Sequence, residues 1–255
     1  MLQSAGCGDS RLEQELKVAA PIGRGKSKGA KLVQEYLKVN GISVGIDGDF
    51  GDATATGLAQ FCSAQTIPVA TTVDQGLMDR LAQPLLRAIA PVAAQATLGA
   101  TVVAVAQQHL KEHPIEIGGP NAGPWVRLYM NGSEGKDFPW CAGFVTYVVR
   151  AAAKAHGQPT PLERTFSCDV LGAEAKKEGR YKRRVSPADA SPGSIFLVPH
   201  GGGNPNDWVH TGIITGGNRT VFNTIEGNTN DSGSREGFEV CARIRSCANV
   251  DVIAL

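Results

Sequence analysis

The sequence predicts an α+β fold, because helical patterns dominate the first part of the chain and strand patterns are concentrated in the last part. Apolar residues recur at three- and four-residue spacing in residues 32–39 and again in residues 144–152, as in amphipathic helices. Residues 208–215 and 220–226 alternate in part and are bounded by turn signals, which indicates strands. A chain of 255 residues is long enough for two units with separate cores.

The front unit, residues 28–83, is predicted to contain three helices. The first includes residues 32–39 and ends at Asn40-Gly41, a common helix stop. Residues 47–51 (Asp-Gly-Asp-Phe-Gly) predict a tight turn, after which Asp52 is suited to cap the second helix. A calcium loop formed by Asp47, Asp49 and Asp52 is a weaker alternative. An EF-hand loop needs Gly at its sixth position and Glu at its twelfth, where this chain has Asp52 and Leu58.

Two connecting segments flank the front unit. Residues 1–27 form an N-terminal extension, and residues 84–100 form a linker that is rich in alanine and contains two prolines. This composition favours a short helical or semi-rigid connection. Residues 101–255 form the second unit, which opens with a helix that Pro114 ends.

Cys141 is predicted to lie in the first turn of the helix whose apolar face spans residues 144–152. Pro139 favours a helix start nearby, because proline has no N–H to lose in a first turn. Unpaired N–H groups and the helix dipole at that end favour a negative charge, which lowers the pKa of a thiol. Cys141 is therefore a candidate nucleophile, although an isolated cysteine is more commonly a buried structural residue.

The two strand patterns predict a hairpin. Residues 216–218 (Gly-Gly-Asn) separate residues 208–215 from residues 220–226 and are typical of a tight turn. Pairing of the two strands would bring the region of His210 close to the Glu226 end of the second strand.

These residue types supply the remaining groups for thiol-dependent amide cleavage. The imidazole of His210 can take the thiol proton, and the carboxylate of Glu226 can orient the ring. Asn228 can orient His210 or donate to an oxyanion. Trp140 and Trp208 are further candidates, for substrate binding. Taken singly, each residue has an ordinary structural interpretation, but the ordered group favours a cysteine hydrolase.

Residues from about 101 to 255 resemble CHAP domains, the cysteine- and histidine-dependent amidohydrolase/peptidase modules of bacterial and phage cell-wall lytic enzymes. The matching segments are residues 139–145, 191–196, 210–214 and 225–229. The resemblance implies a papain-like α+β fold, with the nucleophile helix packed on an antiparallel sheet. It also implies peptidoglycan as the substrate, cut at a peptide or muramoyl-alanine amide bond.

The family's catalytic residues would correspond to Cys141, His210, Glu226 and Asn228, and no metal or other cofactor is expected. The chain departs from the family at Ser194, where an acidic residue usually follows Pro-Gly. That position is structural more than catalytic, so the departure concerns the fold and leaves the mechanism unchanged.

Residues 28–83 resemble the small peptidoglycan-binding domain found beside many wall hydrolases. The matching features are Gln34, residues 47–51 and Val73-Asp74. The family often has Gln-Lys where this chain has Cys62-Ser63, which alters the expected binding surface.

The two resemblances together imply a peptidoglycan hydrolase that acts as a phage endolysin or as a secreted antibacterial effector. A secreted effector would have a secretion apparatus and a cognate immunity protein as partners. Residues 1–16 are polar and lack the pattern of a Sec signal, so such an enzyme would be made in the cytoplasm and reach the wall after lysis or contact-dependent secretion. A net charge of +1 gives no global attraction to nucleic acid, and the apolar runs are too short to span a bilayer.

The sequence also allows two other functions. His109-Leu110-Lys111-Glu112-His113 matches the His-x-x-Glu-His string of inverted zinc peptidases, although Pro114 would end the helix there. The second alternative is a wall-binding or structural protein without activity. The cysteines leave the redox compartment open, because Cys241 and Cys247 can pair or remain reduced.

Overall fold

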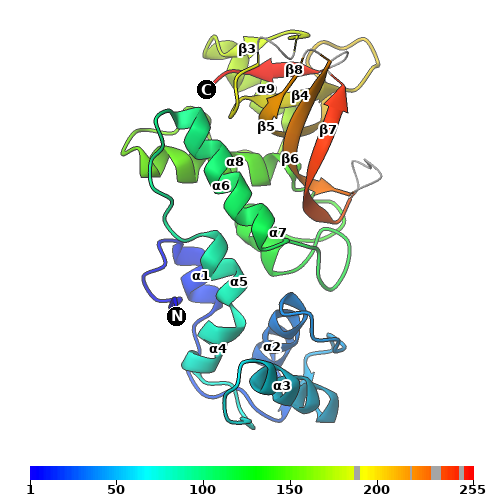
Figure 1. Ribbon diagram of the computed structural model, residues 1–255. Coiled ribbons are helices and arrows are strands. Elements are labelled where there is room, and N and C mark those ends of the chain that lie inside the picture. The colour runs from blue at the N-terminus through cyan, green and yellow to red at the C-terminus, as the bar shows by residue number, and fades with distance from the viewer. Residues whose placement is uncertain (187–189, 219, 231–236, 247–249) are drawn as a thin grey trace.

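The computed structural model describes residues 1–186, 190–218, 220–230, 237–246 and 250–255, and it confirms the α+β fold. Within these residues, the main sheet has six antiparallel strands in the order β3-β8-β4-β5-β6-β7 (Figure 1). The strands are β3 (Tyr181–Lys182), β4 (Ile195–Pro199), β5 (Trp208–Gly217), β6 (Val221–Thr229), β7 (Glu239–Ser246) and β8 (Asp251–Ile253). The predicted hairpin is confirmed as β5 and β6, in which Ile213 pairs with Ile225.

Three helices of the second unit pack on this sheet. They are α6 (Leu98–Lys111), α8 (Cys141–Ala155) and α9 (Cys168–Lys177), and the short α7 (Pro124–Tyr129) packs against α8. Helix α8 contacts β5 and β6, because Phe144, Val145, Val148 and Val149 form a fully buried face. The amino end of α8 is thereby fixed over the two strands that carry His210 and Glu226.

The front unit contains the three predicted helices, α2 (Lys28–Val39), α3 (Asp52–Ala64) and α4 (Gln75–Leu81), and a two-stranded antiparallel sheet of β1 (Gly25–Lys26) and β2 (Asp49–Phe50), which are separated in the chain by α2. Gln34 organises the turn before α3: its amide nitrogen donates to Asp47 Oδ1 at 2.7 Å, and its oxygen accepts from the N–H of Gly48 at 2.9 Å. The expectation that Asp52 caps α3 is wrong. Gly51 is the N-cap residue, and Asp52 is the first helical residue, whose carboxylate pairs with Arg24.

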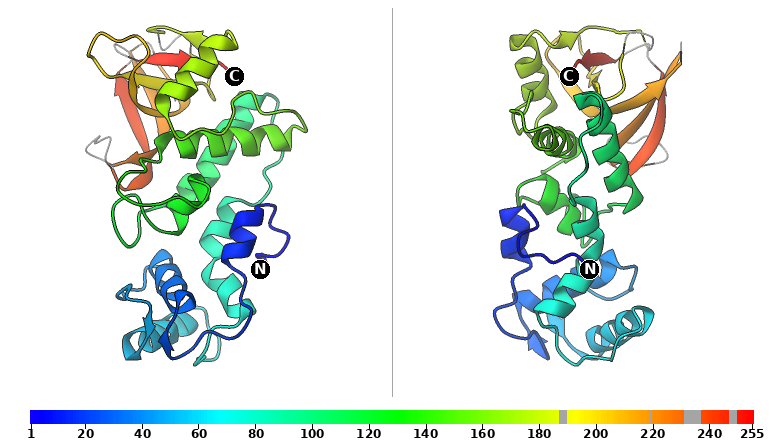
Figure 2. Two further views of the ribbon diagram at one scale, coloured as in Figure 1. Left: turned by 180° about the vertical axis from the view of Figure 1, so that it is seen from behind. Right: turned by 60° about the vertical axis from the view of Figure 1, so that its left-hand side comes forward.

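The N-terminal extension is part of the packed structure. It forms α1 (Ser10–Glu15), whose Leu12 is fully buried, as is the following Leu16. Both residues belong to one apolar core that continues from the front unit through α5 (Gln83–Ala88) into α8. Figures 1 and 2 show α1 beside α5, between the front unit and the sheet.

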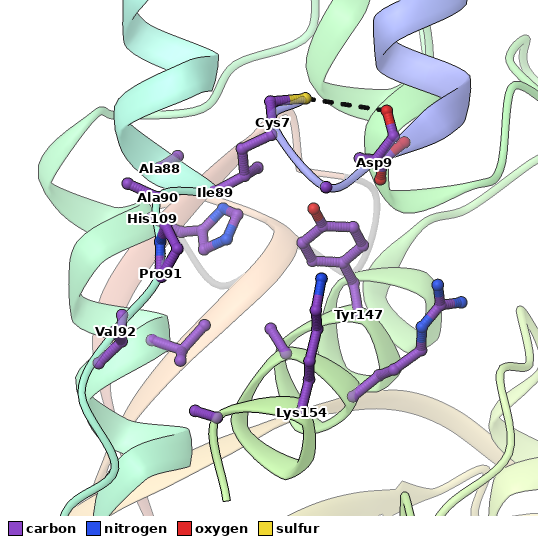
Figure 3. Close-up of a pocket in the computed structure, with 15 residues that line it drawn as sticks. Cys7, Asp9, Ala88, Ile89, Ala90, Pro91, Val92, His109, Tyr147 and Lys154 are labelled. Carbon is purple, nitrogen blue, oxygen red and sulfur yellow. Dashed lines mark hydrogen bonds between the residues drawn. The ribbon is translucent and has the colours of Figure 1, made fainter. Parts of the chain in front are cut away.

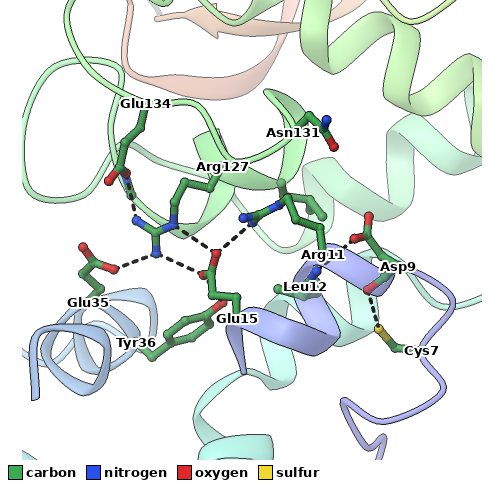
Figure 4. Close-up of polar contacts among 12 residues, drawn as sticks. Cys7, Asp9, Arg11, Leu12, Glu15, Glu35, Tyr36, Arg127, Asn131 and Glu134 are labelled. Carbon is green, nitrogen blue, oxygen red and sulfur yellow. Dashed lines mark hydrogen bonds and ion pairs between the residues drawn. The ribbon is translucent and has the colours of Figure 1, made fainter. Parts of the chain in front are cut away.

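A cluster of charged residues joins α1, α2 and α7 (Figure 4). The guanidinium of Arg127 donates to both carboxylate oxygens of Glu15, at 3.0 and 3.1 Å, to Glu35 at 2.7 Å and to Glu134 at 2.8 Å. Only 11% of the Arg127 side chain is exposed, so these bonds replace its hydration. The Arg127 cluster therefore links the extension and the front unit to the second unit.

The predicted linker, residues 84–100, overlaps a helix at each of its ends. Residues 84–88 are helical within α5, and α6 already begins at Leu98, where Thr97 caps its amino end. In the described part of the chain, none of the helices combines the length and apolar character that crossing a membrane requires.

Candidate active site

Cys141 is the first residue of α8, in the position that the sequence predicts. Trp140 is the N-cap residue, so Pro139 lies just before the helix instead of within its first turn. The unpaired N–H groups of this first turn surround the Cys141 side chain with positive potential. Only 5% of Cys141 is exposed, so little of the thiol faces solvent.

The structure brings His210 and Glu226 together across the β5–β6 hairpin. His210 Nε2 lies 2.8 Å from Glu226 Oε2, and both side chains are almost fully buried. The Glu226 carboxylate therefore binds the protonated Nε2, which leaves Nδ1 as the nitrogen available for proton exchange. Nδ1 is buried without a well-aligned hydrogen bond to any residue that the structure describes.

Arg245 and Thr224 hold the Glu226 carboxylate in place. Arg245 donates from Nε at 2.6 Å and from its terminal nitrogen at 2.5 Å, and the Thr224 hydroxyl donates at 2.6 Å. Burial raises the pKa of Glu226, but Arg245 and His210 outweigh burial and lower this pKa to about 2. Glu226 is therefore a fixed negative charge beside the imidazole at every working pH.

A second cysteine lies against Cys141. Cys168, the first residue of α9, places its sulfur 3.7 Å from the sulfur of Cys141, and both cysteines are free thiols. The sequence did not identify Cys168, because no motif marks it and the two cysteines are far apart in the chain. A signal was nevertheless present in Ser167, a residue type that commonly caps a helix, directly before Cys168.

These contacts favour a thiolate–imidazolium pair. The hydrogen bond with Cys168 and the interaction with His210 outweigh burial and hold the pKa of Cys141 well below its usual value. Burial lowers the pKa of His210, but Cys141 and Glu226 outweigh it and raise this pKa to about 9. At neutral pH the sulfur therefore carries the negative charge and the imidazole carries the proton.

Asn228 lies two residues after Glu226 on β6 and is 1% exposed. Its φ angle is +54°, a left-handed conformation that asparagine adopts more readily than most residues. The position coincides with a shift in the β6–β7 register between Glu226 and Thr229. This bulge changes the direction in which the Asn228 side chain leaves the strand.

The two tryptophans proposed for substrate binding lie in the core. Trp140 is fully buried, stacks on Tyr129 with ring centroids 5.5 Å apart, and donates to Glu116 at 3.0 Å. Trp208 is 4% exposed and donates to Asp251 at 2.9 Å. Both indoles are therefore part of the packed core beside the site and do not offer a surface to a substrate. Among the exposed aromatic side chains, Phe166 is 38% exposed and lies beside the first turn of α8, where its Cδ1 would be 3.4 Å from a Cβ at Gly143.

Two glycines allow the site elements to approach each other. A Cβ at Gly212 would lie 2.6 Å from the Phe196 ring and 2.7 Å from Cγ of Glu226. A Cβ at Gly227 would lie 2.8 Å from both Phe144 and Trp140. These distances are shorter than van der Waals contact, so both positions require the absence of a side chain.

His109 and His113, the two candidate zinc ligands, have different surroundings. His109 is fully buried in α6 and has Nδ1 2.9 Å from the Tyr129 hydroxyl, and burial alone lowers its pKa to about 3. It lines a cavity of about 260 Å³ between α6, α8 and the extension, which includes neither Cys141 nor His210 (Figure 3). His113 lies beyond the end of α6 with a φ of +49° and is bound to Glu239, so the two imidazoles do not share a helical face. Among the described residues, no cluster of three or more metal-ligating side chains occurs.

The question whether Cys241 and Cys247 pair or remain reduced involves a residue outside the described ranges, since Cys247 falls within residues 247–249. Comparisons with protein-family models, with curated proteins and with solved structures find no match to this chain.

Proposed function

We propose that this protein is a cysteine-dependent hydrolase that cleaves an amide bond of peptidoglycan, as a stem-peptide endopeptidase or a muramoyl-alanine amidase. The observation that carries the proposal is the arrangement of Cys141 at a helix amino end beside His210, whose second nitrogen is bound to Glu226. This set of groups is sufficient for nucleophilic catalysis by a thiol. The choice of peptidoglycan depends on the resemblance of the motifs to CHAP domains and of residues 28–83 to a wall-binding domain.

The geometry supports a two-stage reaction. The Cys141 thiolate attacks the amide carbonyl, and N–H groups of the first turn of α8 stabilise the oxyanion. His210 then gives its Nδ1 proton to the leaving amine, so that a thioester remains on Cys141. In the second stage His210 takes a proton from water, which attacks the thioester, releases the acid and regenerates the thiolate. Glu226 keeps the imidazole oriented throughout, because Arg245 and Thr224 fix its carboxylate.

Purified peptidoglycan sacculi provide the direct test. The wild-type protein should release soluble muropeptides, and mass spectrometry of the new termini identifies the bond that is cut. Cys141→Ala should release no more than a buffer control, because the nucleophile is absent. Binding to sacculi without cleavage by the wild type would favour the non-catalytic alternative. If the protein cut only amides that do not occur in the wall, its substrate would lie outside the wall, for example among cytoplasmic peptides.

The pH dependence of the reaction should follow the thiolate–imidazolium pair. The value of kcat/KM for a soluble muropeptide should be constant through neutral pH and fall above about pH 9, as His210 loses the proton for the leaving amine. It should also fall at acid pH, when the Cys141 thiolate is protonated. Glu226→Gln should move the alkaline limb to lower pH, because the carboxylate raises the pKa of His210. Activity that rises through pH 9 to 10 would contradict the ion pair.

The route to the wall is part of the proposal. An endolysin would reach the wall in the course of phage lysis of the host, and a secreted effector would act on a neighbouring cell that lacks the matching immunity protein. In either case the front unit would hold the protein on peptidoglycan while Cys141 acts, which raises the effective concentration of the substrate.

A further inference from the structure

Cys141 and Cys168 occupy equivalent positions on two helices whose amino ends meet. Each is the first residue of its helix, and the two sulfurs are 3.7 Å apart. This distance is far longer than a disulfide bond, which measures about 2.05 Å. It matches a hydrogen bond between a thiol and a sulfur acceptor, since sulfur is large and its contacts are long.

The surroundings decide which sulfur donates. Cys141 faces His210 from β5, and an imidazolium there favours a negative charge on Cys141. The hydrogen bond with the Cys141 thiolate, burial and, to a smaller extent, the Asp169 carboxylate all raise the pKa of Cys168. Cys168 therefore keeps its proton and Cys141 is the acceptor.

The fold holds Cys168 firmly in the donor position. Ser167 caps α9 by accepting from the N–H of Val170, and Asp169 Oδ1 accepts from the N–H of Trp208 at 2.7 Å. Gly172 lies so close to Trp208 that a Cβ there would be 2.5 Å from the indole. Helix α9 is thus fixed to the start of β5, the strand that carries His210.

We propose that Cys168 is a positioning residue of the reaction, whose thiol donates a hydrogen bond to the Cys141 thiolate and keeps that sulfur aimed and charged for attack. The proposal rests on the proposed function. Cys168 forms no covalent bond with substrate and retains its proton throughout. Its hydrogen bond weakens when Cys141 becomes a thioester and re-forms when the thiolate leaves, so it assists both stages.

Alkylation of Cys141 measures its thiolate without any peptidoglycan. The full chain is treated with iodoacetamide over a range of pH, and peptide mass spectrometry follows each cysteine separately. Cys168→Ala should move the midpoint of Cys141 alkylation up by about one pH unit, so that at acid pH the rate falls about tenfold. Cys168→Ser retains a donor and should restore most of this shift. Cys62→Ala removes a buried thiol in α3 and should leave the midpoint unchanged.

The proposal is overturned if Cys168→Ala titrates like the wild type, or if the serine variant behaves like the alanine variant. The wild-type protein provides a measurement that does not depend on folding of a variant. Cys141 should be alkylated well before Cys168 at neutral pH, and equal or reversed order would also overturn the proposal.

The failure of this inference is distinguishable from that of the proposed function. If the wild type releases muropeptides but Cys168→Ala does not shift the midpoint of Cys141 alkylation, the proposed wall cleavage stands and the role of Cys168 is refuted. With cleavage and the shift both present, the acid limb of kcat/KM should move upward in Cys168→Ala with little change in KM. A merely structural role would not produce this split.

Discussion

Replacing His210 with alanine is expected to lower kcat/KM on peptidoglycan fragments by roughly 1,000-fold or more, nearly as much as replacing Cys141. In the proposed reaction the imidazole acts twice, as the cation that stabilises the thiolate and as the donor of a proton to the leaving amine. Both roles depend on Cys141. The double variant Cys141→Ala/His210→Ala should therefore have the same activity as the less active of the two single variants. Steady-state rates of the three variants on one soluble muropeptide provide the comparison.

His113→Asn supplies a matched control for His210. His113 also has Nε2 2.8 Å from a glutamate, but its side chain is 67% exposed, whereas that of His210 is 3% exposed. Asparagine tolerates the left-handed backbone at this position, so the fold should persist. Activity should be unchanged. If His113→Asn abolished cleavage and His210→Ala did not, the thiol mechanism would be refuted and the zinc alternative strengthened.

Replacing Arg127 with alanine is expected to lower the free energy of unfolding by about 3–5 kcal/mol. The substitution removes the cation that pairs with Glu15 and Glu35, and both carboxylates then remain buried without it. Urea unfolding followed by circular dichroism measures the loss. Arg87→Ala removes a similar two-point pair with Glu112, but the Arg87 side chain is 51% exposed, so its loss should stay below about 1 kcal/mol.

The effect of Arg127 should depend on pH with a defined sign. Burial raises the pKa of Glu15, but Arg127, with help from Arg11, outweighs burial and lowers it. Burial also raises the pKa of Glu134, but the N–H of Gly123 together with Arg127 outweighs burial and lowers it. Groups with lowered pKa values contribute stability above their unfolded values, near 4.5, and that stability is lost as pH falls through the folded values. The difference between wild type and Arg127→Ala should therefore shrink below about pH 4. A difference that grows on acidification would contradict this explanation.

Local sequence signals predicted the parts of the site that depend on short-range structure. Pro139 and the apolar spacing after it located the start of α8, and therefore the position of Cys141. The glycines at 216 and 217 indicated the hairpin, although both are the last residues of β5 and pair with Asn223 and Phe222, so the turn comes later than predicted. Strand pairing then brought His210 to Glu226. Each of these inferences needs only a helix period or a hairpin.

The remaining parts depend on contacts between distant segments, which no local pattern encodes. Arg245 reaches Glu226 from the next strand, and Cys168 reaches Cys141 from a helix that the sequence did not single out. Trp140 and Trp208 are large aromatic residues beside the site residues, a position that suits a substrate contact as well as a core contact. Their burial in the fold, together with the close packing of Gly227 on Trp140 and of Gly172 on Trp208, shows that the indoles fill the core.

The close packing at Gly212 and Gly227 limits how this site can change during evolution. An added methyl group at either position would push apart the elements that carry the thiol, the imidazole and the carboxylate. Neither position has room for a Cβ unless the surrounding groups move, so selection for the proposed turnover should keep both as glycine. Distant homologues that retain turnover should thus be recognisable by a glycine two residues after the histidine and another directly after the acidic residue. Lineages that have lost turnover should be free to fill both.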